Sequence, residues 1–132
     1  MTTRRAACQC GQLSLESHGE PVRISVCHCL DCQRRSGSAF AAQARFPQEA
    51  VTITGEARLW QRTADSGQTV FHHFCGTCGS TVYYRCCPNL DLIAVPLGAF
   101  GDPTFPPPRF SVYEKRQHTW VTILGDAVEH YE

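Results

Sequence analysis

The sequence predicts a mainly β fold built from small antiparallel sheets, and three observations support this prediction. Apolar residues mostly recur with a period of two, the segments that show this alternation are short, and Gly, Pro, Asn or Asp bounds most of them. One buried sheet face requires this pattern, and no heptad pattern or low-complexity linker interrupts it. Because 132 residues is an ordinary length for one domain, we expect residues 1–132 to form a single domain with its own core.

The first half of the chain contains four expected strands and one expected helical turn. Residues 13–15 and 22–26 alternate apolar with polar side chains, and a Thr-rich strand at 51–53 ends at a glycine. Small residues from Ser38 to Phe46 predict another strand, which the following proline ends. Asp31–Arg35 is expected to form a single helical turn ending at a glycine.

The second half continues the β pattern, with expected strands at Arg58–Arg62, Thr69–Phe74, Thr81–Arg85, Leu90–Val95 and Phe110–Tyr113. The segment Pro103–Pro108 is too rich in proline for regular structure, so an extended loop is expected there. Apolar residues at 120–124 should return the chain to the body, and a second helical turn is expected near Asp126–His130. Trp60, Trp120 and Phe110 are expected in the core.

Charge and composition exclude several classes of protein. The formal net charge is zero, so a dominant electrostatic attraction to nucleic acid or to an anionic membrane is not expected. No stretch approaches the roughly 20 apolar residues that span a bilayer, and the start of the chain does not resemble a signal peptide. With nine cysteines, the expectation is a cytoplasmic protein that uses its thiols for metal binding rather than for disulfides.

Seven of the nine cysteines have metal-ligand spacing. They are Cys8 and Cys10, then Cys27, Cys29 and Cys32, then Cys75 and Cys78. A tetrahedral zinc takes four ligands, so seven thiols complete one site and leave a second site one ligand short. The last pair is a CxxC followed by a strand-like segment, whereas a redox motif of this type precedes a helix.

The spacing favours one grouping of these thiols but leaves another open. Cys8, Cys10, Cys75 and Cys78 together make a complete set, whose role would be folding stability. Three ligands within six residues, at Cys27, Cys29 and Cys32, would leave a coordination position for water, a substrate or another residue. In the alternative grouping, Cys8 and Cys10 serve the triple cluster. His28, Cys86 and Cys87 are weaker candidates for the missing ligand.

The order of these motifs resembles the glutathione-dependent formaldehyde-activating enzyme family. The matching segments are Cys8-Gln9-Cys10-Gly11, Cys27-His28-Cys29-Leu30-Asp31-Cys32, Gly37-Ser38 with Phe40, and Cys75-Gly76-Thr77-Cys78-Gly79-Ser80. The resemblance implies a β-tent fold with two zinc ions per chain. It implies a structural zinc at Cys8, Cys10, Cys75 and Cys78, and an active-site zinc at Cys27, Cys29 and Cys32, near where glutathione binds.

One residue departs from the family pattern and bears on the substrate. Gln33 stands where the family often has arginine, so Arg34 or Arg35 would have to hold an anionic group of the substrate, with Ser38 nearby. His72 and His73 should face opposite sides of a strand, and either is a candidate proton carrier.

The resulting hypothesis is a zinc-dependent carbon–sulfur lyase of the S-(hydroxymethyl)glutathione synthase type. It would act on glutathione or a related thiol and on formaldehyde or a related adduct. Three thiolates give the open site a net negative charge, which weakens its Lewis acidity and favours holding a thiol over activating a carbonyl. The alternative is a non-catalytic, zinc-stabilised β-tent module that binds a protein partner.

Overall fold

The computed structural model describes residues 1–132 and confirms the mainly β class. Its strands are β1 Thr3–Ala7, β2 Ser14–His18, β3 Arg23–Cys27, β4 Ala41–Pro47, β5 Val51–Thr54, β6 Ala57–Thr63, β7 Thr69–Cys75, β8 Thr81–Cys86, β9 Leu92–Pro96, β10 Phe110–Val112 and β11 Glu129–His130. The α-helix is α1 Leu30–Ser36, and short 3-10 helices cover η1 Gln48–Ala50, η2 Leu97–Phe100 and η3 Glu114–Arg116. No helix has the length and apolar character that a membrane crossing requires.

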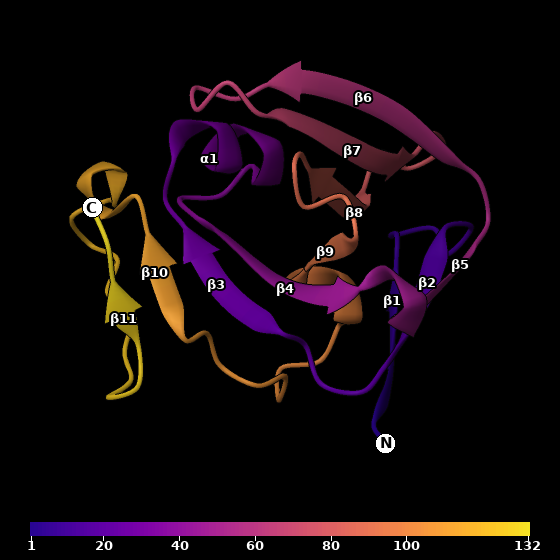
Figure 1. Ribbon diagram of the computed structural model, residues 1–132, viewed down its shortest axis with the longest axis horizontal. Coiled ribbons are helices and arrows are strands. Elements are labelled where there is room, and N and C mark those ends of the chain that lie inside the picture. The colour runs from indigo at the N-terminus through magenta and orange to yellow at the C-terminus, as the bar shows by residue number, and fades with distance from the viewer.

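The strands form two sheets. The smaller sheet is antiparallel and has the order β1-β2-β5, while the larger has the order β11-β10-β3-β4-β9-β8-β7-β6. Within the larger sheet, β10 pairs in parallel with both β3 and β11, and the remaining pairs are antiparallel. Figure 1 shows β6 and β7 along one side of the molecule and β3 and β4 along another, with α1 at one end between them.

The two faces of the larger sheet have different roles. Side chains alternate along each strand, so one face carries residues such as Ile24, Phe46 and Val95, which are buried with residues of the smaller sheet. The core cluster consists of Ala6, Cys8, Leu13, Leu15, Ile24, Ala44, Phe46, Cys75, Val82, Tyr83, Ile93 and Val95. The opposite face is therefore free to line a cavity.

Helix α1 follows the expected turn and is fixed at both ends. The Cys29 sulfur caps its first turn by accepting a hydrogen bond from the backbone N–H of Cys32, with 3.3 Å between donor and acceptor. At the other end, Gly37 adopts a left-handed conformation (φ 66°), and its N–H donates to the Gln33 carbonyl at 2.8 Å. Because this cap occupies the chain after the helix, the strand expected from Ser38 begins only at Ala41.

Two expectations for the apolar and C-terminal residues are wrong. The helical turn near Asp126–His130 is instead a turn followed by β11, because Glu129 donates its backbone N–H to the Arg109 carbonyl at 2.9 Å. Trp60 and Trp120 are 56% and 73% exposed, so neither belongs to the core. Trp60 lies on β6, which is an edge strand with little packed against it, and Trp120 lies in a segment without regular structure.

Candidate metal centres and the adjoining cavity

The first cysteine group joins the two sheets. The sulfurs of Cys8, Cys10, Cys75 and Cys78 all lie within 4.8 Å of one another. The first two cysteines follow β1 of the smaller sheet, whereas Cys75 ends β7 of the larger sheet. We call these residues the four-thiol cluster. The structure groups the thiols in this way, so Cys8 and Cys10 do not serve the triple cluster.

Backbone N–H groups point at the sulfurs of the four-thiol cluster. Leu13 donates to the Cys8 sulfur at 3.3 Å, and Thr77 and Cys78 donate to the Cys75 sulfur at 3.3 and 3.5 Å. Donors of this kind offset the negative charge of thiolates, as they do around the ligands of metal centres. The four sulfurs, with these hydrogen bonds, therefore fit a soft divalent ion such as zinc.

The electrostatics of the CxxC turn support this assignment. The pKa of Cys75 is lowered to about 7, chiefly by the backbone N–H of Cys78 and then by the Gln12 side chain, whose amide lies 3.2 Å from the sulfur. The pKa of Cys78 is lowered to about 5, chiefly by the Ser80 hydroxyl 3.5 Å from its sulfur. Both thiols are thus prepared to lose their protons, as metal ligands must.

The second cysteine group is local in sequence. Cys27 ends β3, Cys29 caps α1 and Cys32 lies in the first turn of that helix, and the three sulfurs lie within 4.8 Å of one another. Hydrogen bonds from Cys27 and Cys32 lower the pKa of Cys29 to about 2, while the contacts among the three thiols raise the pKa values of Cys27 and Cys32, so one thiolate is favoured within the cluster. We call it the three-thiol cluster, and it too could hold a metal ion.

No fourth protein ligand joins the three-thiol cluster. His28 is fully buried between two of its cysteines in sequence, but its Nε2 lies 3.0 Å from the Ser111 hydroxyl and it is not part of the group. Cys86 and Cys87 are also outside the group. The cluster therefore presents three sulfurs and no further His, Cys, Asp or Glu atom of this chain.

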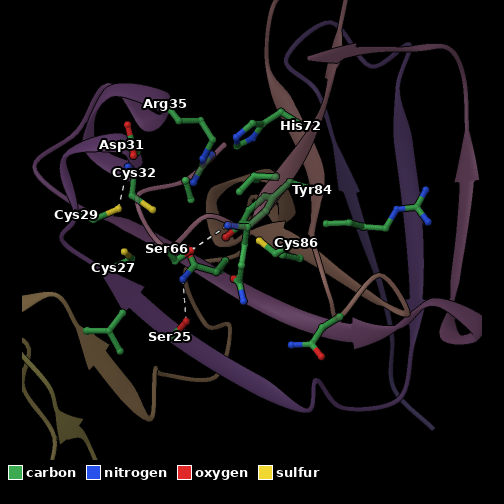
Figure 2. Close-up of a pocket in the computed structure, with 18 of the residues that line it drawn as sticks. Ser25, Cys27, Cys29, Asp31, Cys32, Arg35, Ser66, His72, Tyr84 and Cys86 are labelled. Atoms are coloured by element: carbon green, nitrogen blue, oxygen red, sulfur yellow. Dashed lines mark hydrogen bonds between the residues drawn. The ribbon is translucent and has the colours of Figure 1, made fainter. Parts of the chain in front are cut away.

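A cavity of about 490 Å³ lies beside the three-thiol cluster, and all three cysteines line it. Its floor is the face of the larger sheet opposite the core cluster, because alternation and strand pairing place most of its strand lining residues on that side. Lining residues on the strands include Arg23, Ser25, Cys27, Gln43, Arg45, His72, Tyr84 and Cys86. Figure 2 shows the sulfurs of the three-thiol cluster on one side of this thiol cavity and His72 and Tyr84 further across.

Positive charge predominates in the thiol cavity. Arg35 of α1 and Arg62 of β6 line it together with the strand arginines. Arg62 forms an ion pair with Asp31 at 3.1 Å, whereas Arg35 lies over the Tyr84 ring at 5.1 Å from its centre and has a buried Nη2 without a hydrogen-bond partner. Asp65 is the only other carboxylate in the lining. The cavity is therefore suited to a ligand that carries negative charge.

His72 is a second polar group that the cavity leaves without a partner. Its side chain is only 6% exposed, it packs between Trp60 and Tyr84, and neither ring nitrogen has a hydrogen-bond partner. Burial lowers its pKa to about 4, and the charges of Arg35 and Arg62 add to this effect. The ring is therefore neutral at pH 7, with one N–H to donate and one lone pair to accept.

The structure separates the residues predicted to hold substrate. Arg35 lines the thiol cavity, whereas Arg34 is exposed and does not. Ser38 lines a second pocket, beside Ser80, and not the cavity that contains the three-thiol cluster. Gln33 donates through its side chain to the His28 carbonyl at 2.8 Å and so supports the cluster's backbone.

Sequence reasoning missed the strand arginines of the cavity. Arg23 and Arg45 lie in short strands, where a single arginine is usually a solvated side chain. Counting backward in steps of two from Cys27 places Ser25 and Arg23 on the face that the cluster shares, which is the signal that could have identified them.

The fold and the two thiol clusters define a mainly β protein with two candidate metal centres. Residues 3–116 match the sequence profile of the family described as glutathione-dependent formaldehyde-activating enzyme. The chain therefore belongs to this family, which confirms the resemblance seen in the order of its cysteines.

A solved structure supports the fold. The crystal structure of a Rhodobacter sphaeroides protein, determined as a structural genomics target, is similar, with a TM-score of 0.59 and 21% sequence identity. The match covers 78% of this chain and 91% of that chain, and at this identity it shows the fold alone. No curated protein matches the sequence.

Proposed function

We propose that this protein is a carbon–sulfur lyase of the S-(hydroxymethyl)glutathione synthase type. It would join a thiol such as glutathione to formaldehyde or a related aldehyde, and in the reverse reaction it would cleave the adduct. One observation carries the proposal: the three-thiol cluster lines a cavity of substrate size and has no fourth protein ligand. Membership of the family supports the same chemistry.

Two zinc ions per chain would occupy the two clusters. The four-thiol cluster would hold a structural ion, because its ligand set is complete and none of its cysteines lines the cavity. The three-thiol cluster would hold the second ion through Cys27, Cys29 and Cys32. When bound there, zinc would keep a substrate thiol ionised at neutral pH, although a free thiol has a pKa of about 8.5.

The residues of the chain would bind the substrates and stabilise the negative charge that develops on the aldehyde oxygen. As the sulfur attacks the aldehyde carbon, a carbon–sulfur bond forms, the C=O electron pair moves to oxygen, and that oxygen takes up a proton. The thiol proton leaves to solvent. His72 is neutral and has a free N–H in the cavity, so it can donate a hydrogen bond to the developing oxyanion. Arg35 would hold an acidic group of the thiol.

The proposed partner is a small-molecule thiol, and we place the protein in the cytoplasm, where thiols stay reduced. Nine free cysteines suit such a compartment. The balance of charges, with a formal net charge of zero, argues against nucleic acid as the main ligand.

Activity is tested by mixing the zinc-loaded protein with glutathione and formaldehyde and following the adduct by NMR exchange. We expect formation and cleavage to be faster than in protein-free buffer and to fall to the buffer rate with Cys29→Ser. Cys87→Ser is the control, because Cys87 belongs to neither cluster and does not line the cavity. Unchanged exchange with a fully zinc-loaded protein would reject the lyase and favour the alternative, a non-catalytic module that binds a protein partner.

A further inference from the structure

Two arginines stand directly opposite each other on the floor of the thiol cavity. Arg23 of β3 pairs in register with Arg45 of β4, and both line the cavity. Like charges in this position destabilise an antiparallel pair. Neither guanidinium forms an ion pair in the structure. Burial and the charge of Arg45 lower the pKa of Arg23, while Glu129 and Tyr131 offset this only in part.

Further hydrogen-bond donors converge beside this arginine pair. Arg45 donates to the Ser25 hydroxyl oxygen at 3.3 Å, and the Gln43 amide donates to the same oxygen at 2.8 Å. Ser25 is 1% exposed, and its own hydroxyl proton has no acceptor in the protein. An oxygen that accepts two bonds leaves its proton for a third partner. Figure 2 shows Ser25 on the floor below the sulfurs.

These donors lie at a defined distance along β3 from the three-thiol cluster. Arg23, Ser25 and Cys27 follow one another in steps of two along β3, so they share one face. At about 3.3 Å per residue, Ser25 lies roughly 7 Å and Arg23 roughly 13 Å along the strand from Cys27. A ligand whose sulfur lies at the cluster would reach these donors only with its far end.

We propose that Arg23, Arg45 and Ser25 form an anion subsite for a carboxylate at the far end of the thiol substrate. The like-charged pair is then relieved when the ligand binds, and guanidinium groups suit carboxylates in geometry as well as charge. The substrate class is an extended, acidic thiol, and neutral or very short thiols bind poorly. The thiol part of this inference rests on the proposed function, while the anion subsite does not.

The test is isothermal titration calorimetry of the zinc-loaded protein with two thiols of equal length, mercaptohexanoate and mercaptohexanol. We expect the acid to bind about tenfold or more tightly than the alcohol, as one charge-assisted hydrogen-bonded pair implies. Arg45→Gln should abolish this preference, whereas Arg34→Gln, on the exposed side of α1, should keep it. Arg45→Gln should also melt no lower than the wild type, because it removes a like-charged pair.

Each other outcome separates the subsite from the thiol chemistry. Equal binding of the acid and the alcohol overturns the subsite and leaves the thiol site intact. If hexanoate, which has no sulfur, binds as tightly as mercaptohexanoate and this binding is lost in Arg45→Gln, the result supports the subsite and rejects the thiol site. Tight binding of mercaptoacetate, which is too short to reach from the cluster to the subsite, overturns the proposed distance between them. If none of these compounds binds, both the anion subsite and the thiol site are rejected. Should Arg45→Gln fail to fold, Ser25→Ala must show a smaller loss of the same preference.

Discussion

The two clusters both consist of cysteine thiols but connect different parts of the molecule. The four-thiol cluster brings together residues far apart in sequence, with Cys10 and Cys75 separated by 65 positions, and it links the two sheets. The three-thiol cluster lies within six residues at the junction of β3 and α1. A metal in the first would cross-link the fold, whereas a metal in the second would tie together only a local turn. The second site can therefore keep an open position for a ligand at little cost in stability.

The largest contrast should appear when one ligand of each cluster is removed. Cys75→Ser changes a fully buried cysteine of the four-thiol cluster that would ligate the proposed structural zinc, so we expect the free energy of unfolding to fall by about 4 kcal/mol or more, or the chain not to fold at all. Urea denaturation followed by circular dichroism measures this. Cys87→Ser, outside both clusters, should change stability little. A Cys75→Ser protein as stable as this control would contradict a structural role.

Cys29→Ser should leave the fold intact while removing one metal. Serine is a good helix N-cap and replaces the capping sulfur of Cys29, so the stability change should stay within about 1 kcal/mol. Metal analysis should give about one zinc per chain in place of two. Cys29→Ala, which loses the cap as well, should be less stable than Cys29→Ser by about 1 kcal/mol. Two zinc ions retained in both variants would remove the distinction between the clusters.

Acid should lower the free energy of unfolding of the protein through the protonation of His72, which lines the cavity. Its pKa is lowered from 6.5 to about 4 in the folded state, so between these values the unfolded chain binds more protons. The stability that the protein gains from keeping His72 neutral is fully present above about pH 6.5. It is lost as the pH falls towards 4, which lowers the free energy of unfolding by roughly 2–3 kcal/mol in total.

His72→Gln isolates this contribution. Both proteins keep all nine cysteines, so metal loss in acid is common to them and cancels in the difference between their urea midpoints. The wild type should lose more stability than the variant between neutral pH and about pH 4. Parallel curves for the two proteins would show that the ring is not held neutral by its surroundings.

The smallest expected effect distinguishes neighbouring arginines on α1. Arg35→Gln should raise the KM for glutathione about tenfold with kcat little changed, because Arg35 lines the cavity and would contact substrate equally before and during the reaction. Arg34→Gln is the matched control and should behave as the wild type, since Arg34 is exposed outside the cavity. Equal effects of the two changes on initial-rate kinetics would argue against a specific contact.

Part of this picture could be predicted from the sequence because it depends on local patterns. Period-two alternation predicted the mainly β class, and Gly37 marked the end of α1 correctly. Counting ligands favoured the grouping of Cys8 and Cys10 with Cys75 and Cys78 but left the alternative with the triple cluster open, and the geometry agrees with the favoured grouping. These features rest on spacing and ligand number, which a single sequence displays directly.

The remaining features depend on contacts between distant strands. Trp60 and Trp120 are exposed because one lies on an edge strand and the other in an irregular segment, and neither position is visible in residue type. The parallel pairing of β10 with β11 overrode the helical expectation near the C-terminus. Arg23 and Arg45 became neighbours only through the register of β3 and β4, so their joint role required the structure.

Cobalt substitution tests most directly whether one cluster is closed and the other open to a thiol. Cobalt reports its ligands through its visible absorption, so glutathione should change the spectrum of the three-thiol site and leave that of the four-thiol site unchanged. We predict a spectral change in the wild-type protein that disappears in Cys29→Ser and persists in Cys87→Ser. A wild-type spectrum indifferent to glutathione, or a change that survives in Cys29→Ser, would contradict an open thiol-binding site at Cys27, Cys29 and Cys32.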